Sequence, residues 1–271
     1  MRRKLNMFKG LGSEKPVIGM IHLLALPGSP QYAGTMSDVL SKALRDLKAL
    51  EAGGVDAIMI ENFGDVPFHS GKVGAETVAS MTMIASRMVE SSKLPFGINV
   101  LRNDGESAMS IAAAVGAAFI RVNVLCGARL TDQGIIQGNA HDLMRLRARI
   151  SPNISVMADI DVKHSAPLAE RDIADETADT LKRGLADSLI VSGAGTGKEV
   201  DLQKLQKVHK AAAGAPIFLG SGVSEKNIER YSSLVDGFIV GTAFKEGGNV
   251  DQCVDKKRVL SFMKKLRSQY K

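Results

Sequence analysis

Residues 37–61 read SDVLSKALRDLKALEAGGVDAIMIE and contain the pattern that decides the fold. Apolar residues recur there every three or four positions, at Leu40, Leu44, Leu47 and Leu50. This spacing predicts an amphipathic helix with Ser37 as its N-cap, ended by the glycines at 53–54. The run 55–61 that follows is almost wholly apolar, as in a strand buried on both faces of a parallel sheet.

The same alternation of helix-like and strand-like segments continues along the whole chain. It predicts eight strands, at Val17–His22, Val55–Glu61, Phe96–Val100, Phe119–Asn123, Ser155–Asp161, Ser188–Val191, Ile217–Gly220 and Gly237–Val240. Eight βα units are typical of a TIM barrel, which needs roughly 250 residues. A doubly wound open sheet is the alternative, but the even spacing favours closure. We therefore predict an α/β fold with a single (β/α)8 barrel over residues 16–271, preceded by a leader at 1–15.

The composition excludes several classes of protein. Apolar residues make up 45% and charged residues 24% of the 271 residues, as in an ordinary globular domain. Residues 1–15 hold five basic and one acidic side chain, and residues 251–271 hold seven and two. These ends more than account for the net charge of +6, so the middle of the chain is net acidic. A broad nucleic-acid-binding face is therefore not expected.

The number of cysteines and the length of the apolar runs indicate the cellular compartment to expect for this protein. Cys126 and Cys253 are too few for a disulfide framework and suit a reducing environment. The longest apolar run, Ile111–Ile120, has ten residues and is too short to cross a bilayer. We expect a cytoplasmic protein without a transmembrane segment. The basic residues near the N-terminus leave a mitochondrial presequence as the alternative.

Polar side chains at the carboxyl ends of the predicted strands mark the candidate active site. In a TIM barrel these ends form the mouth that holds the active site, and alternate strand residues face inward. The candidate catalytic residues are Glu61, Arg121, Asp159, Asp161 and Lys163. The candidate substrate-binding residues are His22, Asn99, Asn123, His164 and Ser192.

Several roles remain open for the charged members of this set. Glu61, Asp159 and Asp161 could serve as general acid, general base or ligands of a divalent metal, although no spacing indicates a metal and no cofactor is firmly implied. Lys163 could form a Schiff base, neutralise an anion, or only pair with a carboxylate. Arg121 and an aspartate could form a buried salt bridge that does no more than fix the register of the strands.

Glycine-rich segments follow the sixth, seventh and eighth predicted strands. Glycines at these places allow backbone amides to approach a phosphate, although they could also serve only as tight turns. The segment 192–198 fails the Walker pattern because Glu199 stands where Ser or Thr would hold magnesium. The predicted phosphate-binding residues are Gly193, Gly195, Gly220, Ser221, Gly222, Gly241 and Thr242, with Lys245 as a further candidate.

The longest loop of the predicted barrel is 125–139, between the fourth strand and the next helix. It contains three glycines that could act as hinges, and polar residues including Arg129 and Asp132. This composition suggests a lid over the barrel mouth.

As a set, seven stretches resemble the BtpA family. They are Gly19–Leu23 with Leu26–Gly28, Asp56–Asn62, Pro95–Leu101, Phe119–Asn123, Ala158–His164, Val191–Gly193 and Val240–Lys245. The resemblance covers nearly the whole chain and implies a TIM-barrel-like fold, but it implies no particular reaction. The family is named after a factor implicated in photosystem I accumulation in cyanobacteria, and it includes SgcQ-like proteins encoded beside sugar-uptake genes.

These observations together lead to a functional expectation. We expect an enzyme that acts on a small phosphorylated metabolite, such as a sugar or nucleotide derivative, and that forms a homo-oligomer. The alternative is a non-catalytic assembly or stability factor of the photosystem I biogenesis type. An exposed apolar patch or a barrel mouth filled by apolar side chains would favour this alternative.

Overall fold

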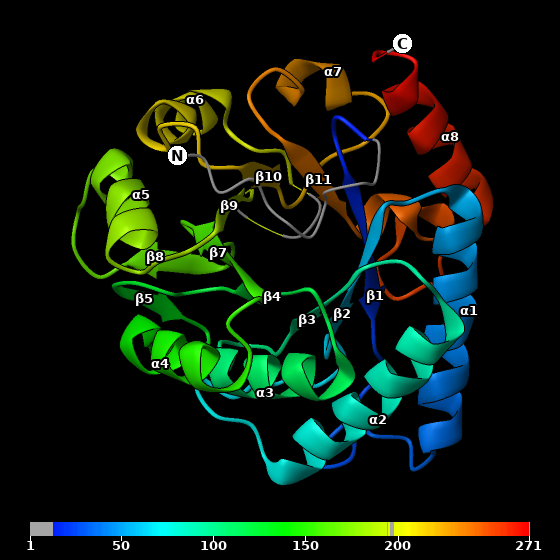
Figure 1. Cartoon of the computed structure of the whole chain (residues 1–271). Coiled ribbons are helices and arrows are strands. Elements are labelled where there is room, and N and C mark those ends of the chain that lie inside the picture. Colours follow the sequence, from blue (N-terminus) through cyan, green and yellow to red (C-terminus); the bar gives the residue numbers. More distant parts are fainter. Residues whose placement is uncertain (1–12, 194, 196–197, 271) are drawn as a thin grey trace.

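The predicted strands close into one parallel barrel, which confirms the expected fold class (Figure 1). The computed structural model describes residues 13–193, 195 and 198–270. Around the barrel the order is β1-β2-β3-β4-β7-β9-β10-β11, and β11 pairs with β1. In this part of the chain the barrel strands are β1 (Val17–His22), β2 (Ala57–Glu61), β3 (Phe96–Asn99), β4 (Phe119–Val122), β7 (Ser155–Ile160), β9 (Ser188–Val191), β10 (Ile217–Leu219) and β11 (Gly237–Val240).

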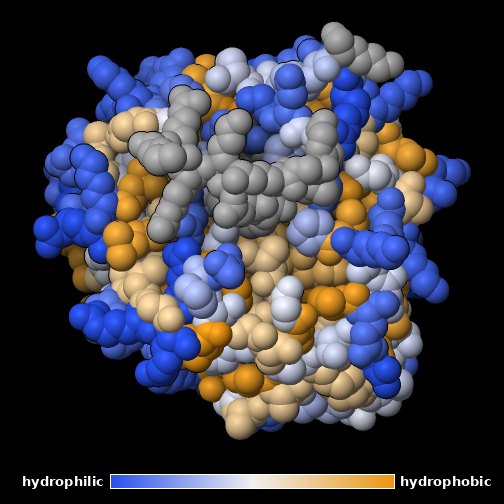
Figure 2. All heavy atoms as spheres, viewed as in Figure 1, coloured by the Kyte–Doolittle hydropathy of each residue, from blue (hydrophilic) through white to orange (hydrophobic). Residues whose placement is uncertain are grey.

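Amphipathic helices surround the barrel and pack their apolar faces on the outside of the strands. They are α1 (Met36–Gly53), α2 (Ala75–Ser91), α3 (Gly105–Val115), α4 (Ala140–Ile150), α5 (Ile173–Lys182), α6 (Leu202–Ala211), α7 (Ile228–Tyr231) and α8 (Lys256–Arg267). The short 3-10 helices η2 (Thr242–Phe244) and η3 (Glu246–Gly248) follow β11. Hydrophilic side chains gather over α5 and α6 on one flank and α8 on the other (Figure 2). These helices therefore turn their polar faces to solvent, as their sequence period predicts.

Two helix boundaries differ from the prediction. Helix α1 begins at Met36 with Thr35 as its N-cap, two residues before the expected cap at Ser37. It ends as predicted, because Gly54 adopts a left-handed conformation with φ +86°. A proline suits the first turn of a helix, and the sequence therefore also predicts a helix that begins near Pro167. Pro167 instead ends strand β8, and α5 begins after Asp172, whose carboxylate accepts a hydrogen bond from the N–H of Ala174.

The barrel interior is an apolar plug below a polar mouth. Its inward-facing side chains are Ile18, Met20, Ala57, Met59, Phe119, Met157, Ile190, Phe218 and Ile239. A larger apolar layer fills the space between strands and helices. Because each strand alternates inward and outward residues, this plug fixes which side chains face the mouth one layer above it.

A small antiparallel sheet, β6-β5-β8, lies outside the barrel and was not predicted. Strands β5 (Ala128–Thr131) and β6 (Gly134–Gln137) form a hairpin within the predicted lid, and β8 (Ser165–Pro167) pairs with β5. The segment 125–139 is therefore held by strand pairing and is not a freely hinged loop.

The N-terminal leader expected at 1–15 lies mostly outside the described residues. Of its described part, Ser13 accepts a hydrogen bond from the guanidinium of Arg267 at 2.8 Å, and the ammonium of Lys15 donates to the carbonyl of Val235. Among the described residues, none of the helices is both long and apolar enough to span a bilayer.

Candidate functional site

The mouth of the barrel carries one polar side chain from each of five neighbouring strands. His22, Glu61 and Asn99 end β1, β2 and β3, while Arg121 and Asp159 lie near the ends of β4 and β7. All five are at least nine-tenths buried. The alternation along the strands therefore places them directly above the apolar plug, as the sequence predicts.

Arg121 and Asp159 form a bidentate ion pair across the mouth. The Nε and Nη2 atoms of Arg121 each lie 2.9 Å from a carboxylate oxygen of Asp159. The side-chain amide of Asn123 donates to the same carboxylate at 3.0 Å, and the Ser192 hydroxyl lies 3.5 Å from it. Burial opposes the charge of Arg121, but the carboxylate outweighs this and raises the pKa of Arg121. Asp159 is therefore fully engaged as an acceptor, which makes it a positioning residue.

Glu61, Asn99 and His22 form a second group beside this ion pair. The Asn99 amide donates to Glu61 Oε2 at 2.6 Å, and His22 Nε2 lies 3.8 Å from Glu61 Oε1. The His22 ring stacks on Phe63 at 4.6 Å between centroids. Burial, and after it the charge of Lys245, lowers the pKa of His22 well below its usual value, so the imidazole is neutral.

Three buried polar atoms at the mouth have no hydrogen-bond partner within the described part of the chain. They are His22 Nδ1, Asn99 Oδ1 and Asn123 Oδ1. The two amide groups donate to carboxylates, which only accept, so their oxygens must face away from Glu61 and Asp159. Buried polar groups are normally satisfied, and each exception calls for an explanation such as a ligand or water.

Lys163 and Arg102 bring further positive charge to the mouth. Arg102 is only 4% exposed and donates from its guanidinium to the carbonyl oxygen of Lys163. Burial lowers the pKa of both side chains. Lys163 was predicted, whereas Arg102 was missed because it lies in the loop after β3, where strand alternation gives no guidance.

Asp161 does not share a face with Asp159 and Lys163, which corrects the expected alternation. Strand β7 ends at Ile160, and Asp161 takes a left-handed φ of 52° that turns its side chain away from the mouth. Its carboxylate pairs with Arg129 of β5 at 2.7 Å and with the Lys204 ammonium of α6. This geometry assigns Asp161 to anchoring the β5–β6 hairpin.

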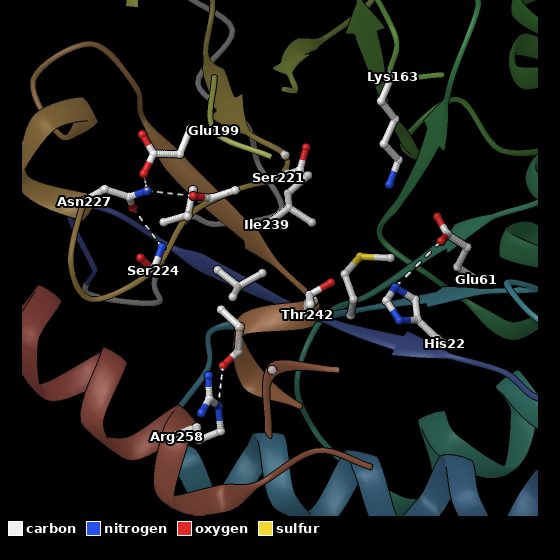
Figure 3. A pocket seen from close by; sticks show the side chains of 18 of the residues that line it. His22, Glu61, Lys163, Glu199, Ser221, Ser224, Asn227, Ile239, Thr242 and Arg258 are labelled. Atoms are coloured by element: carbon white, nitrogen blue, oxygen red, sulfur yellow. Dashed lines mark hydrogen bonds and ion pairs between the residues drawn. The ribbon is translucent and has the colours of Figure 1, made fainter. Parts of the chain in front are cut away.

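A cavity of about 300 Å³ opens at the mouth on the side of β10 and β11 (Figure 3). Its wall includes the predicted residues His22, Glu61, Arg121, Lys163, Gly220, Ser221, Gly222, Gly241 and Thr242. Gly193 and Gly195 lie outside it: the N–H of Gly193 donates to the Ser221 hydroxyl at 3.3 Å, and Gly195 lies beside His164, which is exposed. Three of the predicted catalytic residues, Glu61, Arg121 and Lys163, therefore share one cavity with five of the predicted phosphate-binding residues, whereas Asp159 and Asp161 do not line it.

The glycines of this wall are required for different reasons. A Cβ on Gly222 would lie 2.1 Å from the carbonyl oxygen of Lys198, and one on Gly220 would lie 2.5 Å from the Ile190 side chain. Both glycines are therefore needed by the protein's own packing. Gly241 differs, because a Cβ there would lie 3.0 Å from Cε1 of His22, a residue that itself lines the cavity.

Lys245 is not available to a ligand, contrary to expectation. Its side chain is 0% exposed, and its ammonium pairs with the equally buried Asp46 at 2.9 Å. Asp46 also accepts a hydrogen bond from the N–H of Val254 and pairs with Lys42 at 3.2 Å. Lys245 therefore joins the loop after β11 to α1.

Other residues of the cavity were not anticipated from the sequence. Arg258, in the first turn of α8, donates from Nε to the carbonyl of Ala243 at 2.8 Å. The Asn227 amide donates to Glu199 at 2.9 Å and to the carbonyl of Gly222 at 2.7 Å (Figure 3). No periodicity marked these residues, because they reach the cavity from loops and a helix end. Within the described ranges, no three His, Cys, Asp or Glu side chains gather as a metal site would require.

The low pKa of His22 makes stability depend on pH. The unfolded chain takes up this proton as pH falls below about 6.5, whereas the folded protein resists it, so acid should favour unfolding. We expect the free energy of unfolding to fall below pH 6.5 by at most about 1.4 kcal/mol per pH unit from this group, until the folded pKa is reached. In His22→Gln this slope should disappear, as denaturant titrations between pH 4.5 and 7.5 would measure. The exposed His141→Gln should keep it, and equal slopes in all three proteins would contradict the assignment.

Solved structures with a similar architecture support the fold alone. Phosphoribosyl anthranilate isomerase from Thermus thermophilus aligns with a TM-score of 0.57 and 12% identity, over 94% of this chain and 99% of that one. The native KDPGal structure aligns with a TM-score of 0.59 and 15% identity, over 95% and 97% of the two chains.

Sequence relatives are much closer. The photosystem I biogenesis protein BtpA of Synechocystis is 43% identical over 97% of this chain and 91% of its own. An uncharacterised protein of Thermococcus kodakarensis is 48% identical over 93% and 97% of the two chains, and the sgc region protein SgcQ of Escherichia coli is 35% identical over 94% and 96%. The family model described as BtpA family matches residues 13–268. This chain therefore belongs to the BtpA family.

Proposed function

We propose that this protein is an enzyme that acts on a small phosphorylated metabolite at the mouth of its barrel. The observation that carries the proposal is the single cavity that joins the glycine loops after β10 and β11 to Glu61, Arg121 and Lys163. Barrel enzymes commonly hold phosphate at loops in these two places. A volume of about 300 Å³ lies at the small end of ligand pockets, which suits a metabolite rather than a polymer.

The distribution of charge in the cavity suits a ligand with an anionic end. Ser221 and Thr242 offer hydroxyl donors next to the glycine backbone, and Arg258 brings a guanidinium to the same wall. On the facing side, the Glu61 carboxylate and the His22 imidazole line the same cavity and can receive polar groups of the organic part. A sugar phosphate or a related polyol phosphate carries both kinds of group.

Glu61 is the best candidate for acid–base chemistry. Its Oε2 accepts from Asn99, while Oε1 faces the neutral His22 at 3.8 Å and the cavity. The carboxylate of Asp159 is occupied by Arg121 and Asn123, and Asp161 lies outside the cavity. We therefore assign proton transfer to Glu61. Asp159 instead holds the guanidinium of Arg121 in position.

Ligand-induced stabilisation tests the proposed phosphate site. We expect dihydroxyacetone phosphate and inorganic phosphate to raise the melting temperature, since a ligand of the folded state adds about 2.7 kcal/mol at 100 times its Kd. Gly241→Val should abolish this shift, because its side chain would enter the cavity beside His22. The backbone at Gly241, with φ −113° and ψ −87°, lies outside the α and β regions, so circular dichroism is used to verify that the variant folds. The matched control is Gly71→Val, whose side chain would meet open space and should leave the shift intact.

Two outcomes would contradict the phosphate site. One is the absence of any shift at millimolar phosphorylated ligand. The other is an equal shift in Gly241→Val and the unmodified protein, because the anion would then bind elsewhere on the surface.

A binding role without catalysis is the second candidate, and one observation favours it. Leu130 and Ile135, which are paired across β5 and β6, are each about half exposed beside the barrel mouth, as is Leu168. Such a face suits a partner surface, either in an assembly factor like the named Synechocystis relative or in a homo-oligomer. Against it, the mouth is lined by paired polar groups instead of being filled by apolar side chains. Measuring the oligomeric state of Leu130→Ser and Ile135→Ser by light scattering tests whether this face binds a second copy.

A further inference from the structure

Lys245 and Lys163 are two lysines of this barrel that differ in burial and in their partners. Lys245 pairs with Asp46 at 2.9 Å, as a structural buried lysine must. Lys163 is partly exposed and lines the cavity, and within the described part of the chain no carboxylate lies within 4.0 Å of its ammonium nitrogen and no hydrogen bond to that nitrogen is formed. Its side chain extends into the cavity toward His22 and Glu61 (Figure 3).

The carboxylates that could neutralise Lys163 are already engaged by other groups. Asp159 is held by both guanidinium nitrogens of Arg121, and Glu61 accepts from Asn99. Arg102 adds a second guanidinium next to Lys163, where it donates to the Lys163 carbonyl oxygen. A lysine in this position does not complete an ion pair, so pairing alone does not explain it.

We propose that Lys163 is a nucleophile that forms a Schiff base with a phosphorylated aldehyde or ketone bound in this cavity. This inference rests on the proposed function and narrows its substrate to a carbonyl compound. The phosphate would lie at the loops after β10 and β11, and the carbonyl carbon would face β7 and Lys163. His22 and Glu61, which line the same cavity, would contact hydroxyl groups near the carbonyl.

The surroundings of Lys163 favour the neutral form of its amine, which is the form that reacts. Only a neutral amine can attack a carbonyl, and burial, together with the charges of Arg121 and Arg102, lowers the pKa of Lys163. Glu61 and Asp159 act in the opposite direction, but burial is the largest influence. Lys163 therefore offers the free amine at a lower pH than a lysine on the surface.

The Schiff base forms through a carbinolamine, with release of one water molecule. The lone pair of Nζ forms a bond to the carbonyl carbon, the C=O π bond breaks, and the oxygen takes a proton to give a carbinolamine. Loss of the hydroxyl group with a second proton releases one water and leaves a protonated imine. The Glu61 carboxylate is positioned to pass the proton of the attacking nitrogen to this oxygen, and the proton that leaves with the hydroxyl group comes from solvent water. The iminium then draws electrons from the adjacent carbon, which weakens its C–H or C–C bond.

Borohydride trapping tests the proposal directly. The full-length protein is incubated with dihydroxyacetone phosphate, reduced with sodium borohydride, digested and mapped by mass spectrometry. We expect one dominant adduct, at Lys163, and at least a tenfold loss of total label in Lys163→Arg. The control Lys72→Arg, at a lysine whose side chain is 77% exposed, should leave the label unchanged.

Two further measurements separate this site from general reactivity of lysines. Inorganic phosphate should compete with labelling of Lys163, because both ligands use the same loops. Labelling should also remain efficient at pH 7, where a surface lysine with an ordinary pKa is almost wholly protonated. Label spread evenly over exposed lysines, or label at Lys163 that phosphate does not reduce, would overturn the proposal.

The outcomes distinguish this inference from the proposed function on which it rests. If dihydroxyacetone phosphate raises the melting temperature but leaves Lys163 unlabelled, the Schiff base is wrong and the phosphate site stands. If neither dihydroxyacetone phosphate nor inorganic phosphate raises the melting temperature and no adduct forms, both are wrong. An adduct at Lys163 that is lost in Gly241→Val supports both.

Discussion

Replacing Arg121 with alanine should lower the free energy of unfolding by about 3–5 kcal/mol, because it leaves a buried aspartate without its partner. Arg121 is 2% exposed and makes two 2.9 Å hydrogen bonds to Asp159, so water cannot replace the lost guanidinium without opening the barrel. Urea denaturation of the variant and the unmodified protein measures the difference.

A control and a double variant sharpen this prediction. Arg183→Ala removes an arginine whose side chain is 82% exposed and should change stability by less than about 0.5 kcal/mol. Arg121→Met combined with Asp159→Leu removes both charges and should recover most of the loss. An unchanged unfolding midpoint in Arg121→Ala would show that the pair is not buried as described.

Replacing Asp46 with alanine should have an effect of similar size, about 3–5 kcal/mol, at the contact between α1 and the loop after β11. The substitution removes the carboxylate that pairs with Lys245, whose side chain is 0% exposed. It also removes the acceptor for the N–H of Val254. Lys245 should then lose its proton when the protein folds, because burial already lowers its pKa. The stability of Asp46→Ala should therefore fall further as pH decreases from 9 to 6, since the unfolded chain keeps this proton and the folded one does not.

The measurement is again denaturant unfolding, at several pH values. Asp46→Leu combined with Lys245→Met removes both buried charges and should restore much of the stability without this added pH dependence. A loss in Asp46→Ala no greater than that in Asp38→Ala, an exposed aspartate of the same helix, would contradict the prediction.

The barrel could be predicted from the sequence because its strands are unbroken apolar runs at even intervals. Such runs indicate strands that are buried on both faces of a parallel sheet. The polar residues that interrupt them are therefore easy to recognise. The alternation of inward-facing and outward-facing strand residues correctly placed five side chains at the mouth, those of His22, Glu61, Asn99, Arg121 and Asp159. That rule holds only while the backbone remains extended.

Predictions from the sequence become wrong where the backbone leaves the strands. At Asp161 a left-handed residue breaks the alternation, so a residue two positions after Asp159 points elsewhere. The hairpin in 125–139 was missed because its turn, Asp132–Gln133, is not a common two-residue hairpin sequence. Lys245 carries no local sign that its partner is Asp46, 199 positions away along the chain. Contacts of this kind depend on tertiary packing and have no sequence period.

The pairing of β5 with β8 makes the loops after β4 and β7 a single module. Arg129 reinforces it, since its guanidinium reaches Asp161 at 2.7 Å as well as Glu176 of α5. A change of length in one loop would break the register of the other, so the two should be inherited and exchanged together. Grafting a new specificity onto this scaffold would then require both loops to be transplanted as a unit, whereas the glycine loops after β10 and β11 could stay in place.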